Sequence, residues 1–285
     1  MTTSGPTDLR TIVVTGATAG IGRALAETLA AAGPTVAIAA RDRARGETAR
    51  TEIAAASGND RVELYAGDLS SLASVRDLAG ALAEAHPTID VLVHCAAIYT
   101  ARRSVTVDGY ETMLATNVLA PFLLTNLLLG PLRAARSARV IVLAAPSGTM
   151  LDLEDLQAER KFRSLTVFGA SKAADLLFTF ELARRLKDTS VTANAVHPGL
   201  ARTGLMRQAV APLRWAIRPI SASPARAAAA IAPLALSPEY EGKTGRFFHA
   251  GREIDPPAYT RDRQEARRLW DAAAALTALG EADPA

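Results

Sequence analysis

Thr15-Gly-Ala-Thr-Ala-Gly-Ile-Gly22 is the stretch that decides the fold of this 285-residue chain. It follows an apolar run with the composition of a β-strand, residues 12–14, and precedes an alanine- and leucine-rich run typical of a helix that continues to Leu29. Glycines at this place let backbone N–H groups approach a pyrophosphate, and the N-terminus of the helix adds partial positive charge. Because the stretch joins a strand to a helix, a phosphate-binding turn is a far better interpretation than an ordinary glycine-bearing turn.

Apolar runs of strand composition alternate with helical stretches along the rest of the chain. These runs are residues 36–38, 62–64, 91–93, 140–143, 191–193 and 245–248. Such alternation predicts the α/β class, with a doubly wound parallel sheet that is buried on both faces. No internal repeat, linker or second composition zone interrupts it, so we expect a single domain over residues 1–285. Within it, prolines punctuate an excursion at about 200–223, and a C-terminal helix is predicted at about 261–276.

Composition and charge exclude several classes of protein. With 49% apolar residues the chain is able to bury one large core, and its net charge of +3 is too small and dispersed to predict binding to nucleic acid. A single cysteine, Cys95, excludes an internal disulfide and fits a reducing compartment. The N-terminus lacks an apolar signal core, and the longest apolar stretch, residues 121–132, is too short to span a bilayer. We therefore expect a soluble, cytoplasmic protein with no membrane partner.

The second predicted strand ends in Ala39-Ala40-Arg41-Asp42, which bears on the choice of cofactor. In a dinucleotide-binding sheet, an acidic residue at the tip of this strand hydrogen-bonds both ribose hydroxyls and disfavours a 2′-phosphate. Here Ala40 is at the tip, and Arg41, which is suited to bidentate contact with a phosphate, follows it. This pattern favours NADP(H) over NAD(H). The alternative is that Arg41 is simply a solvated side chain in a charged run with Arg43 and Arg45.

Several ordered motifs extend beyond the glycine-bearing turn. Residues 15–22 have the form TGxxxGIG, and the others are Thr116-Asn117-Val118, the run 122–126, His197-Pro198-Gly199 followed by Arg202-Thr203, the run 237–239 and the run 267–270. With these motifs the chain resembles the short-chain dehydrogenases/reductases, and within them the retinol-dehydrogenase-like branch, from Thr15 to about Leu279. The resemblance implies a Rossmann-type fold, binding of a nicotinamide cofactor and an oxidoreductase activity of the kind used in biosynthesis.

The resemblance also implies which residues contact the cofactor. The complete set is Gly16, Thr18, Ala19, Gly20, Ile21, Gly22, Arg41, Asp68, Leu69, Ala96, Asn117, Lys172, Pro198, Gly199 and Thr203, with Asp68 matching the adenine-contacting aspartate. One loop departs from the family, because His94-Cys95-Ala96-Ala97 stands where Asn-Asn-Ala-Gly is usual, so the cofactor pocket is expected to be reshaped there. His94 is either a titratable group near the centre or a structural residue at a strand end, and the structural interpretation is favoured.

Four family positions carry the chemistry, and two of them differ here. In the family a Ser orients the substrate carbonyl, a Tyr transfers the proton, a Lys lowers the pKa of the Tyr and holds the ribose, and an Asn carries a water. Lys172 and Asn117 match the last two. Phe168 occupies the Tyr position and Ala145 the Ser position, while Ser147 substitutes only if the turn before it is rearranged. The cofactor side of the centre is therefore expected to persist, and the proton-transfer side to be lost.

The absence of a positioned acid limits the reactions that this centre supports. Such an acid contributes on the order of 10²–10⁴-fold, so ordinary ketone reduction or alcohol oxidation is not expected. Hydride transfer needs no acid when the acceptor is an iminium, an oxocarbenium ion or a strongly polarised enone. The leading hypothesis is an NADP(H)-dependent enzyme for such a substrate, with Lys172 as electrostatic stabiliser, as acid or only as ribose ligand. The alternatives are a non-redox cyclase, isomerase or lyase on this fold, and a catalytically silent nucleotide-binding protein.

Two further expectations concern partners, and no metal site is predicted. Residues 200–223, where the family builds a substrate lid, contain large apolar side chains, so a small apolar substrate is expected; these are Leu205, Met206, Leu213, Trp215 and Ile217. The alternative is that they pack the lid or a subunit contact. By resemblance, the helix after Phe168 would form the face of a homodimer or homotetramer through Leu176, Leu177, Phe180 and Leu182. Those residues fit a buried core equally well.

Overall fold

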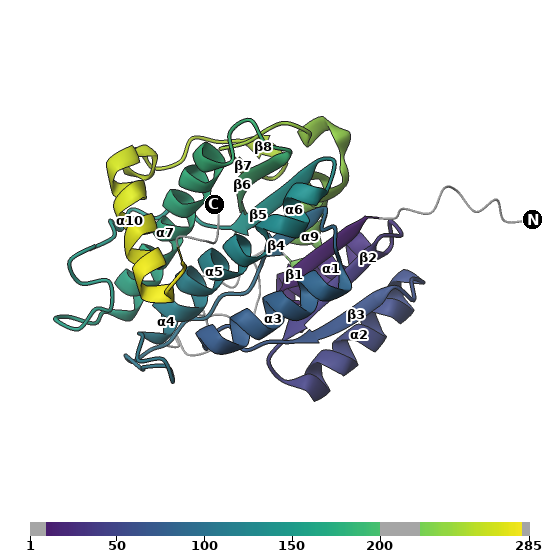
Figure 1. Ribbon diagram of the computed structural model, residues 1–285, viewed down its shortest axis with the longest axis horizontal. Coiled ribbons are helices and arrows are strands. Elements are labelled where there is room, and N and C mark those ends of the chain that lie inside the picture. The colour runs from purple at the N-terminus through teal and green to yellow at the C-terminus, as the bar shows by residue number, and fades with distance from the viewer. Residues whose placement is uncertain (1–9, 200–222, 281–285) are drawn as a thin grey trace, which may run out of the picture.

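The centre of the protein is an eight-stranded sheet, described by a computed structural model for residues 10–199 and 223–280 (Figure 1). In spatial order its strands are β3 (Val62–Ala66), β2 (Thr35–Ala40), β1 (Thr11–Thr15), β4 (Val91–His94), β5 (Ala138–Leu143), β6 (Val191–His197), β7 (Phe247–His249) and β8 (Arg252–Glu253). Strands β1 to β7 pair in parallel, and β8 pairs antiparallel with β7 at the edge. The sheet is of the Rossmann type, and the predicted doubly wound α/β fold is confirmed.

The inner strands form where the sequence has short apolar runs rich in β-branched residues. Every residue of β1 and of β5 is buried. In register, Val14 of β1 lies between Ile38 of β2 and Val93 of β4. A parallel sheet that is covered on both faces needs apolar residues at successive positions, which is why these strands read as continuous apolar runs and not as alternating ones.

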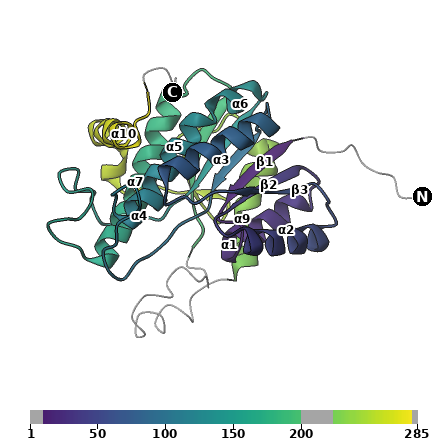
Figure 2. The same cartoon turned by 60° about the horizontal axis from the view of Figure 1, so that its bottom comes forward.

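Helices cover both faces of the sheet (Figure 2). One face carries α1 (Gly20–Ala30), α2 (Arg43–Ser57) and α9 (Pro224–Leu236); the other carries α3 (Leu72–Ala85), α5 (Ala120–Leu127), α6 (Leu129–Ala134) and α7 (Ser164–Arg185). Shorter pieces are α4 (Thr112–Leu114), the π-helical turn η1 (Ala115–Leu119), and the 3₁₀ turns η3 (Pro238–Tyr240) and η4 (Ala258–Arg261). The last helix, α10 (Arg263–Thr277), lies where a C-terminal helix is predicted.

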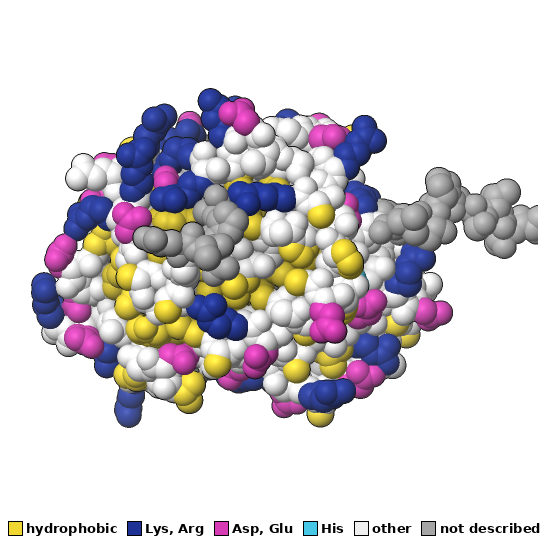
Figure 3. Space-filling model, viewed as in Figure 1, with side chains coloured by type: hydrophobic (Ala, Val, Ile, Leu, Met, Phe, Trp, Pro, Cys, Tyr) yellow, Lys and Arg dark blue, Asp and Glu magenta, His cyan; other side chains and the backbone are white. Residues whose placement is uncertain are grey.

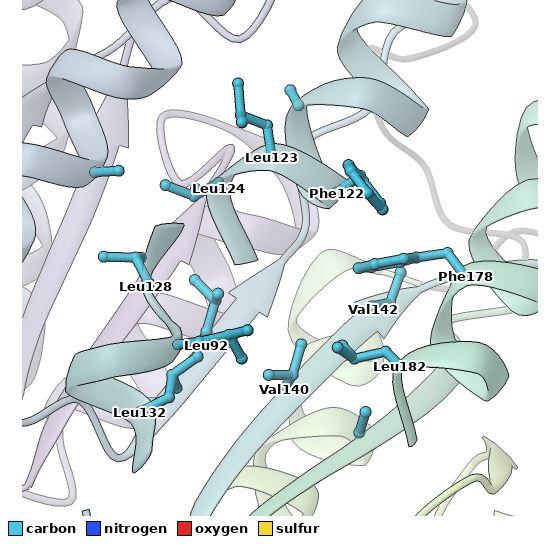
Figure 4. Close-up of a cluster of buried hydrophobic side chains, with 14 of the residues drawn as sticks. Leu92, Phe122, Leu123, Leu124, Leu128, Leu132, Val140, Val142, Phe178 and Leu182 are labelled. Carbon is cyan, nitrogen blue, oxygen red and sulfur yellow. The ribbon is translucent and has the colours of Figure 1, made fainter. Parts of the chain in front are cut away.

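Helix α10 packs on α5 and α7 through a cluster of aromatic side chains. The rings of Phe122 and Phe178 pack edge-on with centroids 5.9 Å apart (Figure 4), and Trp270 of α10 lies edge-on to Phe122 at 4.8 Å. The guanidinium of Arg185 lies over the Trp270 ring, 4.3 Å from its centroid. An aromatic pair contributes about 0.5–1.5 kcal/mol beyond the burial of its area, so these contacts make α10 an integral part of the fold.

The position of α10 overturns the expected dimer face on α7. Leu176, Leu177, Phe180 and Leu182 are each at most 5% exposed, because the chain itself covers them. Leu177 and Leu182 belong to the core that α10 completes, whereas Leu176 and Phe180 pack in a smaller cluster beside β7. A side chain buried within its own chain is not available to a second subunit. The prediction from resemblance was therefore wrong for these residues, and the core interpretation is correct.

The surface carries charges of both signs. On the face seen in Figure 3, lysine and arginine side chains are interspersed with aspartate and glutamate around a middle region where apolar side chains gather. This mixture fits the small net charge of +3. Within residues 10–199 and 223–280, none of the helices combines the length and the apolar character that crossing a bilayer requires.

Candidate active site

The predicted site residues gather at the carboxyl edge, which is the edge formed by the carboxyl ends of the parallel strands. The strand order reverses between β1 and β4, and ligands of doubly wound sheets bind at such a switch point. The glycine turn, residues 15–22, joins β1 to α1 at this place. Lys172 and Asn117 reach the same edge from α7 and from η1.

The glycine turn is packed so closely that side chains are excluded from it. Gly16 and Gly20 adopt positive φ angles of 70° and 59°. A Cβ on Gly16 would lie 2.7 Å from the Cα of Ala96, and a Cβ on Gly22 would lie 2.3 Å from the carbonyl oxygen of Gly16. The glycines therefore bring β1, α1 and the loop after β4 into direct contact. The remaining predicted residues of the turn, Thr18, Ala19 and Ile21, lie between them.

The N-terminus of α1 has no side-chain cap. Its N-cap residue, Ala19, makes no capping hydrogen bond, and the first turn contains no acidic residue. By contrast, α2, α3, α9 and α10 are capped by Asp42, Ser71, Ser223 and Asp262. The first N–H groups of an uncapped helix lack side-chain partners and carry partial positive charge, which favours a bound phosphate. The turn and the helix together fit the pyrophosphate of a dinucleotide.

Thr15 joins the glycine turn to the loop after β4. Its hydroxyl oxygen accepts hydrogen bonds from the backbone N–H groups of Cys95 at 3.1 Å and Ala96 at 3.3 Å. The Cys95 thiol lies below α1, where a Cβ on Gly22 would be 3.2 Å from its sulfur. Burial raises the pKa of this thiol to about 12, so it stays protonated and unreactive. The loop that departs from the family sequence is thus fixed to the cofactor turn.

The tip of β2 presents an arginine and no free acid. Ala40 is buried and Arg41 is exposed. The carboxylate of Asp42 accepts a hydrogen bond from the backbone N–H of Arg45 at 3.0 Å, because it caps α2. The acid nearest the tip, Asp42, is therefore occupied as the N-cap of α2, and Arg41 lies beside the tip as an exposed cation.

Asp68 lies in the loop after β3, where its side chain holds the loop in shape. Its Oδ1 accepts hydrogen bonds from the backbone N–H of Ser70 at 2.9 Å and from the Ser70 hydroxyl at 2.7 Å. Its own N–H donates to the Ser74 hydroxyl oxygen at 2.9 Å. Leu69 packs against the core below α3 and α5. The pair is thus held rigidly at the carboxyl edge.

Asn117 is buried in the π-helical turn η1, where its amide acts as a clamp. Its Oδ1 accepts from the N–H of Ile98 at 2.8 Å, and its Nδ2 donates to the carbonyl oxygen of Ile98 at 3.0 Å and to the Ser171 hydroxyl at 3.1 Å. The Ser171 hydroxyl in turn donates to the carbonyl oxygen of Phe168 at 2.8 Å. Pro121, which has no N–H, lies in the first turn of α5, just after this π-helical turn. The clamp therefore joins the loop after β4 to α7.

The Phe168 ring is half-buried in the first part of α7. Its neighbour is the ring of Tyr99, whose centroid lies 5.8 Å away at an interplanar angle of 78°. The Tyr99 hydroxyl donates to the Ser164 hydroxyl oxygen at 2.8 Å. On the other side, the Lys172 Nζ lies 5.8 Å from the Phe168 centroid. Phe168 thus presents an apolar ring beside Lys172, with no group that transfers a proton.

Lys172 is buried and forms an ion pair on its own helix. Its Nζ donates to the Oδ2 of Asp175 at 2.7 Å and to the carbonyl oxygen of Leu143 at 3.3 Å. Leu143 is the last residue of β5, so the ammonium lies directly below the carboxyl edge. Burial raises the pKa of Asp175 to about 6, and the charge of Lys172 acts against that rise.

The loop after β5 brings Ala145 and Ser147 to the start of α7. Ala145 is half-buried and offers only a methyl group. The Ser147 Oγ accepts the N–H of Thr149 at 3.1 Å and lies against α7, since a Cβ on Gly169 would be 3.0 Å from it. The Tyr259 hydroxyl of η4 lies 2.9 Å from the carbonyl oxygen of Ser147 and 2.8 Å from that of Thr149. A Cβ on Gly169 would lie 2.7 Å from the Thr149 hydroxyl oxygen, so the loop places two hydroxyls, those of Ser147 and Thr149, beside the residue after Phe168.

Pro198 and Gly199 follow β6 at the same edge. Gly199 has a φ of 75°, and the ring of His249 on β7 lies 4.9 Å from the ring of His197. Burial, together with the neighbouring His249, lowers the pKa of His197. Thr203 and the predicted lid at about 200–223, apart from its last residue, lie outside the described residues.

His94 is buried against α5. Its Nε2 lies 2.7 Å from the Thr125 hydroxyl oxygen on α5, and only 3% of the residue is exposed. Burial lowers its pKa to about 3, so the ring is neutral at ordinary pH. Its position supports the structural interpretation of this residue.

Three residues at the site were missed by sequence reasoning. Asp175 had a visible signal, because it is the acid within an apolar run of α7, between Ala174 and Leu176. Tyr99 and Tyr259 had none, because they belong to no motif and only the fold brings them to α7 and to the loop after β5.

The sequence and the fold are similar to those of several known proteins. A family model described as short chain dehydrogenase matches residues 10–213. Retinol dehydrogenase 14 of Mus musculus is 36% identical over 283 residues, which cover 92% of this chain and 84% of that protein. An uncharacterized protein from Mycobacterium paratuberculosis has a TM-score of 0.74 at 30% identity, over 96% of both chains. A short chain dehydrogenase from Burkholderia cenocepacia in complex with NADP has a TM-score of 0.67 at 28% identity, over 86% of this chain and 98% of that one.

Proposed function

Since this chain belongs to the short-chain dehydrogenase/reductase family, in its retinol-dehydrogenase-like branch, we propose that it delivers hydride from NADP(H) to a small apolar substrate without a tyrosine proton donor. The oxidoreductase class and a nicotinamide cofactor come with the family. One observation carries the rest of the proposal. The Lys172 Nζ lies 5.8 Å from the Phe168 ring, and by the resemblance Lys172 and Asn117 match the family's Lys and Asn, whereas Phe168 and Ala145 take the positions of its Tyr and Ser.

The residues at the carboxyl edge fit NADP(H). The bare glycine turn and the uncapped start of α1 suit the pyrophosphate, and the exposed Arg41 suits a 2′-phosphate. The similar protein from Burkholderia cenocepacia was solved with NADP, which supports the same choice here. When bound, the reduced cofactor supplies a hydride. Lys172 uses two of its three N–H groups on Asp175 and Leu143, which leaves one to hold the ribose.

An acceptor that is already cationic or strongly polarised suits this centre. An iminium carbon that gains a hydride forms a C–H bond, and the C=N electron pair becomes the lone pair of a neutral amine, so no proton is needed. A ketone that gains a hydride becomes an alkoxide and must take up a proton, which neither Phe168 nor Ala145 is able to give. The Phe168 and Tyr99 rings, which pack with Met113, provide an apolar wall for such a substrate.

Deuterium transfer from NADPH labelled at C4 tests the proposal. We expect label to appear stereospecifically in the products of a cyclic iminium or an activated enone, and not in the product of a simple ketone. Equally fast reduction of the ketone would contradict the role given to Phe168 and Ala145. Turnover of a substrate without label transfer would favour a non-redox reaction, and failure to bind NADPH in calorimetry would remove the whole proposal. Labelled NADH serves as the matched control for the cofactor.

A cytoplasmic location and self-association stay predictions. The first is supported by the single cysteine, which is a free thiol. Self-association, if present, uses a surface other than the four buried side chains of α7 named above. Light scattering coupled to size-exclusion chromatography measures it directly.

A further inference from the structure

The ion pair between Lys172 and Asp175 lies in the most deeply buried stretch of α7. The two side chains are 9% and 4% exposed, and the Nζ to Oδ2 distance is 2.7 Å. Burying two charges has a desolvation cost that an apolar pair of similar size avoids, so a buried ion pair is weak evidence for stability. Its neighbours Ala173, Ala174 and Leu176 show that apolar residues fit this stretch. We therefore attribute the presence of Asp175 to its effect on the Lys172 ammonium and not to packing of the core.

Lys172 has an acid as its ion-pair partner within the described part of the chain. Among residues 10–199 and 223–280, Asp175 is the acid with which Lys172 forms an ion pair. The nearby Cys95 thiol is held neutral by its burial. The ring of Phe168, at 5.8 Å, is apolar and uncharged. Among the described residues, the charge at this point of the carboxyl edge thus comes from two groups of opposite sign, which nearly cancel.

The near-cancellation of the Lys172 and Asp175 charges matters because Phe168, unlike a tyrosine, has no hydroxyl to interact with the ammonium. The carboxylate of Asp175 lies 2.7 Å from the Lys172 Nζ, so the two opposite charges largely offset each other. An ammonium without this partner would repel any positive group placed near it, and the repulsion would be strong in a buried site. With Asp175 in place, a cationic group meets a nearly neutral pair.

We propose that Asp175 is a positioning residue that holds the Lys172 ammonium in place and neutralises it, so that the substrate pocket accepts a positively charged, iminium-type electrophile. This inference rests on the function proposed above, and it selects the cationic acceptor from the acceptors considered there. Lys172 then serves as a fixed cofactor ligand, and the pocket excludes neither a cationic substrate nor the cationic form of the nicotinamide.

Binding of two probes of the same shape tests the charge of the pocket. The probes are the 1-benzylpyridinium cation and neutral diphenylmethane, titrated by calorimetry into the protein with NADP⁺ present. We expect the wild-type protein to bind the cation at least as tightly as the neutral probe. In Asp175→Asn, the cation is expected to bind about tenfold more weakly, while the neutral probe is unchanged, because only the cation meets the unpaired ammonium. A purely structural role for Asp175 would weaken both probes alike and would overturn the proposal.

A double variant keeps the test decisive if Asp175→Asn does not fold. Lys172→Met combined with Asp175→Leu removes both charges, and its affinity for the cofactor is expected to fall. At an NADP⁺ concentration that saturates the variant, we expect the ratio of its affinities for the cation and for the neutral probe to equal that of the wild-type protein. Persistently weak binding of the cation in this variant would overturn the proposal. The wild-type protein alone also tests whether Asp175 neutralises Lys172. If the cation binds it about tenfold more weakly than diphenylmethane, the pocket is not neutralised and the proposal is overturned. Label transfer and NADPH binding are measured separately, so failure of the proposed function is distinguished from failure of this inference.

Discussion

The glycine turn and the reactive end of α7 lie at the same edge of one sheet, but they are built differently. The turn acts through its backbone, and its shape depends on the absence of side chains at Gly16 and Gly22. The end of α7 acts through side chains, namely Phe168, Lys172 and Asp175. A backbone site accepts few substitutions because any Cβ collides with it, whereas a side-chain site exchanges its chemistry without disturbing the fold. Substitutions at the end of α7 are therefore able to change the chemistry of the site while the glycine turn keeps its shape.

The largest effect is expected from restoring both missing hydroxyls at the side-chain site. In Phe168→Tyr combined with Ala145→Ser, the new phenol would lie near the Lys172 ammonium, which is 5.8 Å from the present ring centroid. We expect kcat/KM for reduction of a simple ketone with NADPH to rise on the order of 10²–10⁴-fold, the usual contribution of a positioned acid. Ala145→Ser alone lacks that acid and is the control. No gain in a folded, NADPH-binding double variant would show that the two halves differ by more than two hydroxyls.

The backbone site is tested by adding a single methyl group. Gly22→Ala places a Cβ 2.3 Å from the carbonyl oxygen of Gly16, so the turn must shift. We expect the affinity for NADPH to fall about 100-fold, which corresponds to the ~3 kcal/mol at the upper end of overpacking strain. Gly80→Ala in α3 is the matched control, because its Cβ would meet nothing within 4 Å. Titration calorimetry measures both, and normal binding by Gly22→Ala would mean that the turn is less rigid than its packing indicates.

His94, at the end of β4 between the two halves, is expected to make stability depend on pH. Its pKa is about 3 in the folded chain because burial favours the neutral ring. The unfolded chain takes up this proton below its ordinary pKa, so the stability that His94 contributes is present above about pH 6.5 and is lost as the pH falls toward 3. Between about pH 6.5 and about pH 4.5 the loss is about 2 kcal/mol. Urea unfolding of wild type and His94→Asn compares the slopes, and equal slopes would contradict burial of a neutral ring.

The smallest effect is expected at the tip of β2, where a side chain adds to the backbone site. Arg41 is exposed beside the buried Ala40, in a position suited to a 2′-phosphate. Arg41→Ala is expected to weaken NADPH about tenfold, near the lower end of the ~1.5–3 kcal/mol of a charged hydrogen bond. The affinity for NADH, which has no 2′-phosphate, is the internal control and stays unchanged. Equal losses for both cofactors would assign Arg41 a general role in place of a selective one.

The two halves also differ in how well their sequences predict them. The strands and the glycine turn were predictable because burial requires apolar residues and close backbone packing requires glycine, so both features are visible in the sequence. Phe168 was equally visible in the sequence, since it lies four residues before Lys172 in a recognisable motif. The partners of those residues were not predictable. Tyr99 reaches Phe168, and Asn117 reaches Ser171, only through tertiary contacts that leave no periodic pattern in the chain. The predicted α7 face was wrong for the same reason, because α10 covers Leu177 and Leu182, and β7 packs on Leu176 and Phe180, from distant parts of the sequence.

The π-helical turn η1 also makes the segment around it intolerant of insertions and deletions. Successive residues of an α-helix are rotated by about 100°, so losing one residue within 115–119 would turn Asn117 away from Ile98 or from Ser171. The same deletion in an exposed loop would change little. Among chains that share this clamp, the number of residues between the loop after β4 and α5 is therefore expected to vary less than the residues themselves. An alignment of such chains would show this segment as a stretch without gaps.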